Sequence, residues 1–186
     1  PSGSTEEPPR AVRGGQKVVA RSFLLPGYAE IHGTGEHCGS TAMANLLRFH
    51  TSTTLSEAAV LGLSGAIWFC AVWPPLVPRP IVFGRTITLE TGICEHLELP
   101  YAEQPASDTE AWSVARDALH GDSPVVLMGD SAQLDYFGGP PFPGHRFLLV
   151  GYDEAAGVAI VGDPKDHAAT DLIARIRALP EGGSSS

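Results

Sequence analysis

The spacing of hydrophobic residues changes from a helical period to a strand period part-way along this chain, and that change most restricts its fold. The runs HRFLLVGYD (145–153) and GVAIVGD (157–163) flank the turn sequence EAAG, which predicts an antiparallel hairpin. The run SPVVLMGD (123–130) predicts a further strand. Upstream, helical spacing predicts helices that begin at Cys38 and that cover 54–63, 87–99 and 108–121. Helices followed by antiparallel strands predict an α+β protein.

Weaker patterns complete the expected order of elements. Residues 17–25 predict a strand, 64–73 a strand-like apolar run before a proline-rich loop, and 166–179 a final amphipathic helix. The segments 1–16 and 181–186 are rich in small and polar residues, which predicts a flexible leader and a disordered tail. Between them we expect a single domain over 17–180.

Charge and cysteine usage narrow the range of functions. The 186-residue chain has 12 basic and 21 acidic residues, a formal net charge of −9, which argues against nucleic acid as a partner. No apolar run reaches the roughly 18 residues of a membrane-spanning helix, and the first residues lack the order of a secretory signal. Three cysteines without a CxxC pair favour a cytoplasmic protein. Seven histidines without metal-ligand spacing argue against a metal site.

Cys38 lies between a charged, glycine-rich loop and the helix that is predicted to begin at this residue. At a helix N-terminus, backbone N–H groups and the helix dipole stabilise a thiolate, which lowers the pKa of the thiol and makes it a nucleophile. The small residues at 39–41 leave room for a substrate. The alternative is a packed structural cysteine, the commoner role of a free cysteine. Position by itself does not decide between them.

His145 opens one strand of the predicted hairpin, and Asp163 ends the other. Because both lie at a similar distance from the turn, pairing of the strands should bring the two side chains close together. A carboxylate there can fix the orientation of the imidazole while its other nitrogen faces a thiolate, in the order nucleophile, base and orienting group. Each residue also has an ordinary interpretation, as a strand-end histidine and as an Asp-Pro turn. Together with Cys38 they favour catalysis.

The chain resembles the N-terminal domain of the butirosin biosynthesis protein H family over about residues 31–164, through the segments HCGSTAMANLL, LSEAAVLGLSGAIWF, SPVVLMGD and GHRFLLVGYDEAAGVAIVGDP. That family has the papain-like cysteine-protease fold. The resemblance therefore implies a papain-like catalytic domain over 17–180, in which the helix with the nucleophile packs on an antiparallel sheet. It also implies Cys38 as nucleophile, His145 as base and Asp163 as orienting residue.

The family member that provides the name is an acyltransferase of aminoglycoside antibiotic biosynthesis, which moves an aminoacyl group from an acyl carrier protein thioester onto an amine. The resemblance thus implies a transferase whose partner is an acyl carrier protein and whose acceptor is a small amine or hydroxyl compound. It implies no cofactor besides the phosphopantetheine arm that delivers the acyl group. A cysteine peptidase or amidase with the same triad, and an inactive binding module that keeps the fold, are the alternatives.

Further residues are candidates for binding the substrate. Papain-like enzymes use a glutamine before the cysteine for the oxyanion hole, and no glutamine lies there in this chain. We expect the backbone N–H of Cys38 and the side chain of His32 to serve instead, with His37 in the same role or as a structural neighbour. Asp130 either binds a cationic acceptor or caps a turn, and Tyr136 either lines the cleft or packs.

Overall fold

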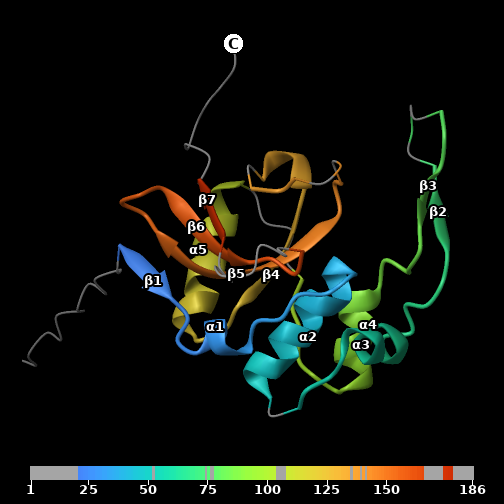
Figure 1. Ribbon diagram of the computed structural model, residues 1–186, viewed down its shortest axis with the longest axis horizontal. Coiled ribbons are helices and arrows are strands. Elements are labelled where there is room, and N and C mark those ends of the chain that lie inside the picture. The colour runs from blue at the N-terminus through green and yellow to red at the C-terminus, as the bar shows by residue number, and fades with distance from the viewer. Residues whose placement is uncertain are drawn as a thin grey trace, which may run out of the picture.

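The computed structural model describes residues 21–51, 53–73, 75, 78–103, 108–134, 136–138, 140, 142–165 and 174–177. Within them, helices and antiparallel strands form an α+β fold (Figure 1). The elements are β1 (Ser22–Leu24), α1 (Tyr28–Ile31), α2 (Cys38–His50), α3 (Glu57–Leu63), β2 (Cys70–Val72), β3 (Ile81–Phe83), α4 (Leu89–His96), α5 (Asp108–His120), β4 (Val125–Gly129), the 3₁₀ turn η1 (Ser131–Gln133), β5 (His145–Asp153), β6 (Val158–Gly162) and β7 (Ala174–Arg177).

β5 is the central strand of the main sheet, and all of its neighbours run antiparallel to it. β4 lies beside its first half, where Gly129 is opposite His145, and β1 lies beside its last residues. β6 pairs with its other edge, and β7 pairs with β6. β5 is buried along nearly all of its length. The strand that begins with His145 is therefore held in place on both edges and both faces.

α2 contributes to two hydrophobic cores. Its Ala42 packs in the core that is built on β5, while Met43 and Leu47 pack in a second core with residues of α3 and α4. Figure 1 shows α2 between the sheet and the α3–α4 pair. Protein interiors are close-packed, so a helix enclosed in this way has little freedom to shift. The packing therefore fixes the position of Cys38 at its N-terminal end.

The helices predicted over 54–63, 87–99 and 108–121 correspond to α3, α4 and α5. Of the two residues that the sequence offers as the cap of α3, Thr54 and Ser56, the structure uses Ser56, whose hydroxyl accepts a hydrogen bond from the N–H of Ala59 at 3.1 Å. The strand predicted over 17–25 is observed as β1, and residues 17–20 lie outside the described part of the chain. The predicted hairpin is observed as β5 and β6.

β2 and β3 form a separate two-stranded hairpin that extends away from the body of the protein (Figure 1). We call residues 67–84 the arm. The prediction of a strand over 64–73 is correct only for 70–72, which form β2. Gly65 has a left-handed backbone (φ 67°), and the carbonyl of Ala66 accepts from the N–H of Thr86 at 3.2 Å, which closes the base of the arm instead of extending a strand.

The predicted C-terminal helix is wrong where the structure describes it, because residues 174–177 form β7. Pairing with β6 gives partners to backbone groups that would otherwise be exposed on a sheet edge, and this pairing outweighs the helical pattern of the segment. The other residues of 166–179 lie outside the described part of the chain, as do 1–16 and 181–186. The single domain over 17–180, the flexible leader and the disordered tail thus stay predictions.

Candidate active site

Cys38 is the first residue of α2 and is 8% exposed. The preceding residue, His37, caps the helix, since its Nδ1 accepts a hydrogen bond from the N–H of Ser40 at 3.1 Å. Burial and the nearby charge of Arg85 lower the pKa of His37, in keeping with a neutral ring whose Nδ1 is an acceptor. The structure thus places His37 as a helix cap beside Cys38, which suits the role of a structural neighbour.

The structure brings Cys38, His145 and Asp163 together from three different elements. Nε2 of His145 lies 2.7 Å from Oδ2 of Asp163, and these two side chains are 2% and 1% exposed. The thiol of Cys38 interacts with the same imidazole, and this interaction lowers the pKa of the thiol and raises the pKa of the ring. The ladder between β5 and β6 ends with Leu148 opposite Gly162. Asp163 therefore follows the last pair and reaches back to the start of β5.

The electrostatics of these three groups favour a thiolate beside an imidazolium. Burial raises the pKa of the Cys38 thiol, but hydrogen bonds from His145 and from the backbone N–H of Arg146 outweigh it, so the pKa is lowered. Burial lowers the pKa of His145, whereas its bonds to Asp163 and Cys38 raise the pKa to about 9. Burial raises the pKa of Asp163, but hydrogen bonds from His145 and the N–H of Lys165 hold it below its ordinary value. This balance favours the nucleophilic thiolate form of Cys38 more than the surroundings of an ordinary thiol do.

The carboxylate of Asp163 has donors besides His145. The hydroxyl of Tyr136 donates to Oδ2 at 2.7 Å, and the backbone N–H of Lys165 donates to Oδ1 at 2.8 Å. Several donors on one carboxylate fix its orientation, and through it the orientation of the imidazole. The structure shows the hydroxyl of Tyr136 on the carboxylate of Asp163, and a role of Tyr136 in lining the cleft stays a prediction.

Glu57, at the start of α3, holds the loop that precedes Cys38. Its carboxylate accepts from the backbone N–H of Glu36 at 2.9 Å and from the backbone N–H of His37. The hydroxyl of Ser40 also donates to it, at 3.3 Å. No pattern in the sequence indicates this role, because a glutamate in the first turn of a helix is already explained by the helix dipole.

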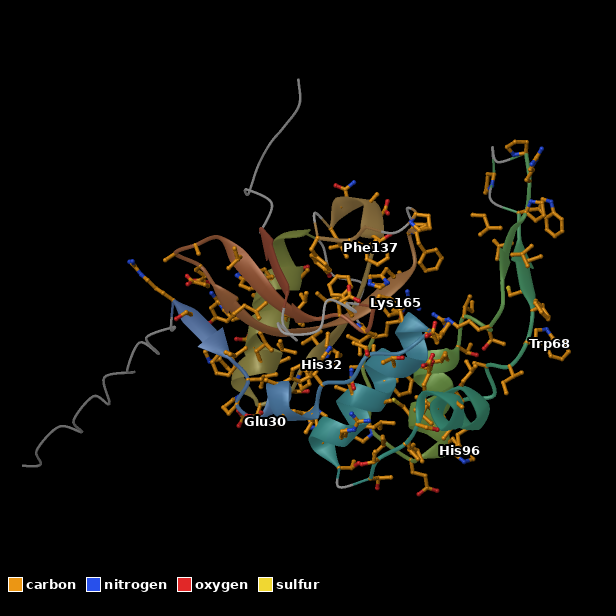
Figure 2. All side chains as sticks on the ribbon, viewed as in Figure 1. Glu30, His32, Trp68, His96, Phe137 and Lys165 are labelled. Carbon is orange, nitrogen blue, oxygen red and sulfur yellow. The ribbon has the colours of Figure 1, made fainter. Side chains whose placement is uncertain are left out.

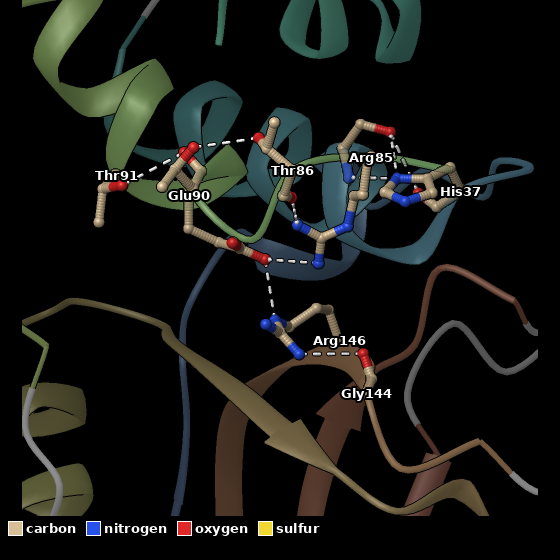
Figure 3. A network of polar contacts seen from close by, with 9 residues as sticks. His37, Arg85, Thr86, Glu90, Thr91, Gly144 and Arg146 are labelled. Carbon is tan, nitrogen blue, oxygen red and sulfur yellow. Dashed lines mark hydrogen bonds and ion pairs between the residues drawn. The ribbon is translucent and has the colours of Figure 1, made fainter. Parts of the chain in front are cut away.

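A cluster of charged side chains lies over the N-terminus of α2 (Figure 3). Oε1 of Glu90, on α4, is 3.3 Å from Nη2 of Arg85 and 2.8 Å from Nε of Arg146, the second residue of β5. A Cβ placed on Gly39 would lie 3.4 Å from Nη2 of Arg85 and 3.5 Å from Oε1 of Glu90. We call these three residues the Arg85–Glu90–Arg146 cluster. It packs against the residue that follows Cys38.

The two other candidates, His32 and Asp130, have partners elsewhere. Nδ1 of His32 lies 3.2 Å from the hydroxyl of Tyr28, a fully buried side chain. Asp130 accepts from the N–H of Ala132 at 2.9 Å and caps η1, which is the turn-capping role considered for it. Figure 2 shows His32 in the body of the protein, well apart from Trp68 on the arm. Oxyanion binding by His32 and acceptor binding by Asp130 stay predictions.

The fold and these side chains define an α+β protein in which a cysteine at the start of a buried helix lies beside a histidine that is hydrogen-bonded to an aspartate. The family model described as butirosin biosynthesis protein H, N-terminal, matches residues 37–164. The protein therefore belongs to this family, as its resemblance indicated. No curated protein and no solved structure matches the chain. Across the described residues, no helix is both long and apolar enough to cross a bilayer.

Proposed function

We propose that the protein is a cysteine-dependent acyltransferase of natural-product biosynthesis, which accepts an acyl group from a thioester onto Cys38 and passes it to an amine or hydroxyl acceptor. The observation that carries this proposal is the convergence of Cys38, His145 and Asp163, in which the imidazole hydrogen-bonds to Asp163 and interacts with the thiol of Cys38. Membership of the butirosin biosynthesis protein H family supports the biosynthetic context. The packing of α2 on an antiparallel sheet supports a papain-like fold.

In the first step, the thiolate of Cys38 attacks the carbonyl carbon of the thioester and forms a new C–S bond. The carbonyl oxygen gains negative charge, for which the backbone N–H of Cys38 at the helix N-terminus is the proposed donor, with His32 as the second. The intermediate then collapses, and the C–S bond to the donor thiol breaks. Protonated His145 gives its proton to the leaving thiolate. The products are acyl-Cys38, a free thiol and a neutral imidazole.

In the second step, the acceptor attacks the acyl-Cys38 carbonyl while neutral His145 takes the proton from its nitrogen or oxygen. The C–S bond to Cys38 breaks, which releases the product and restores the thiolate beside a protonated imidazole. Asp163 keeps the ring in one orientation through both steps, since its carboxylate is itself held by Tyr136.

The proposed donor is an acyl group on the phosphopantetheine arm of an acyl carrier protein, with no other cofactor. Thiolate attack on a thioester exchanges one C–S bond for another, which suits a cysteine nucleophile. The net charge of −9 favours a cationic amine as acceptor over long distances, and it provides no such attraction to an acidic carrier. Docking of a carrier would therefore depend on local contacts.

Loading of Cys38 tests the proposal directly. The protein is incubated with an acyl-pantetheine thioester, and its intact mass is followed. We expect wild type to gain the mass of one acyl group and Cys38→Ala to gain none. Cys70→Ala is the matched control, because Cys70 lies on the arm, and it should load like wild type. Loading of Cys38→Ala at the wild-type rate would show that the nucleophile is wrongly assigned.

Addition of an amine then tests the second step. We expect a cationic amine to discharge the acyl-enzyme and to appear as an amide in the product mass. Discharge by water alone, together with cleavage of peptides, would instead identify a peptidase or amidase that uses the same residues.

A further inference from the structure

Two arginines converge on the thiol end of α2 from distant parts of the chain. Arg85 follows the arm, and Arg146 is the second residue of β5. Both guanidinium groups contact Oε1 of Glu90, at 3.3 and 2.8 Å. Each also donates to a backbone carbonyl through Nη1, Arg85 to Thr86 and Arg146 to Gly144, both at 2.9 Å. These bonds hold the two guanidinium groups near each other beside the nucleophile.

The cluster holds more positive charge than its own carboxylate neutralises. Two guanidinium groups share the carboxylate of Glu90, and the N-terminus of α2 adds the positive end of its dipole. Within the described residues, Nε of Arg85 and Nη2 of Arg146 have no hydrogen-bond acceptor. The two side chains are 14% and 15% exposed, so solvent reaches them. Partly buried guanidinium donors without a protein acceptor suit an external anion.

The position of this charge stands out in a chain whose net charge is −9. A Cβ placed on Gly39 would lie 3.4 Å from Nη2 of Arg85, so this guanidinium lies beside the backbone next to Cys38. In the loop that precedes Cys38, the carbonyl of Glu36 accepts a hydrogen bond from Nζ of Lys165. Positive groups thus gather where the acyl group of a donor would lie.

We propose that the Arg85–Glu90–Arg146 cluster is an anion-binding subsite, which takes a carboxylate or phosphate group of the acyl donor through the open N–H edges of its two arginines. The inference rests on the proposed function, because it names the kind of donor that loads Cys38. Glu90 holds the guanidinium groups in place and leaves an excess of positive charge for the ligand. The anion belongs either to the acyl group itself or to the carrier arm.

Two alkylating reagents test the subsite without any acyl transfer. Iodoacetate and iodoacetamide react with the same thiolate and differ by a carboxylate in place of an amide, so the ratio of their rates cancels any change in the pKa of Cys38. We expect Arg85→Gln to lower the iodoacetate-to-iodoacetamide ratio about 10-fold. Glu90→Gln should raise the ratio, because it removes the competing carboxylate. Arg116→Gln, in an exposed ion pair with Glu154, should leave it unchanged.

A structural cluster behaves differently in this experiment. If Arg85→Gln and Glu90→Gln slow both reagents by the same factor, the cluster only supports the fold and the proposal is overturned. The opposite signs expected for the ratio in the two variants separate anion binding from such support, since loosened packing would change access of both reagents alike and leave their ratio unchanged.

Four thioesters then identify the source of the anion. They carry either a glutaryl group or the methyl ester of that group, which has no free carboxylate, and each acyl group is offered on pantetheine and on 4′-phosphopantetheine. Faster loading of glutaryl on either thiol, lost in Arg85→Gln, assigns the subsite to an acyl carboxylate. Faster loading of both acyl groups from phosphopantetheine, lost in the same variant, assigns it to the phosphate. Equal loading of all four by wild type overturns the subsite and leaves the proposed acyl transfer standing. No loading, with an alkylation ratio that still responds, contradicts the proposed function and supports the anion subsite.

Discussion

Beside Cys38 the polar side chains of His145 and Asp163 are buried and hydrogen-bonded to each other, whereas on the arm large apolar side chains are exposed. His145 and Asp163 are 2% and 1% exposed, and Trp68 and Phe69 are 69% and 78% exposed. Burial of a charged group costs free energy unless partners compensate it, and His145 and Asp163 are partners of each other. The aromatic rings of the arm forgo most of the stabilisation that burial would provide.

The two regions are therefore constrained in different ways. At the site, each polar group depends on its neighbours, so loss of one leaves the others buried without a partner. The arm is a two-stranded hairpin that contributes little to the cores of the protein, and such hairpins have little stability of their own. Changes at the site should alter chemistry or folding strongly, and changes on the outside of the arm should alter folding little.

The largest effect is expected at the imidazole. His145→Ala should slow acyl loading of Cys38 by about 10²- to 10⁴-fold, because the thiolate loses its proton partner. The control is His50→Ala, at the opposite end of α2, where the ring lies 3.2 Å from the hydroxyl of Ser123 near the surface. The time course of the intact mass measures both. Normal loading by His145→Ala would remove the base from the proposed mechanism.

Core and arm should then differ in their contribution to folding. Leu148→Ala, at a fully buried position of β5, should lower the free energy of unfolding by about 2–5 kcal/mol. Trp68→Ala removes a larger side chain from an exposed position and should change it by no more than about 0.5 kcal/mol. Urea unfolding measures both values. A cost at Trp68 as large as that at Leu148 would mean that the arm is packed against other parts of the chain in solution.

Substitution of two glycines should give smaller changes in stability, of opposite sign. A Cβ on Gly35 would collide with the side chains of Thr41 and Glu57, so Gly35→Ala should destabilise the fold by about 1–3 kcal/mol. It should also slow alkylation of Cys38, because the loop before the nucleophile has to move. Gly62, within α3, has nothing within 4 Å of such a Cβ, and Gly62→Ala should stabilise the helix by about 0.5–1 kcal/mol. Thermal unfolding of the two variants should shift in opposite directions.

The smallest effect is expected when the pH is lowered through the neutral range. The pKa of Cys38 is lowered and the pKa of His145 is raised to about 9, and both shifts favour the thiolate–imidazolium pair there. Alkylation of Cys38 by iodoacetamide should therefore change little, whereas an ordinary thiol slows about tenfold per pH unit below its pKa of roughly 8.5. A slope of that size at Cys38 would contradict the thiolate assignment.

At high pH the same groups predict a decline. Acyl loading should fall as pH rises through about 9, since His145 then lacks the proton for the leaving thiol. The contribution of this histidine to the free energy of unfolding also falls as the pH rises. It is complete below the pKa of an unfolded histidine, about 6.5, and is lost as pH rises through about 9. The free energy of unfolding, measured by urea unfolding between about pH 6.5 and 9, checks this loss of stability independently of acyl loading.

Local signals in the sequence were enough for much of the fold. The start of α2 at Cys38 and the hairpin of β5 and β6 were both predicted, because helix starts and short turns are encoded in adjacent residues. The nearness of His145 and Asp163 followed from the same hairpin and is confirmed by their hydrogen bond.

Non-local pairing explains what was missed. Residues 174–177 were expected in a helix and pair with β6 instead, and the arm pairs with itself apart from the main sheet. The short elements α1 and β3 were not predicted either, since three or four residues carry too little periodicity to distinguish them from loops.

The sequence by itself determined the order of the main helices and strands, the family, and the hairpin that joins His145 to Asp163, because each depends on residues close together along the chain. Only the tertiary structure decided that Tyr136 bonds to Asp163, that Glu57 holds the loop before Cys38, and that two arginines share Glu90 beside the thiol. Those contacts join side chains that already have an ordinary local explanation, so no pattern along the chain reveals their partners.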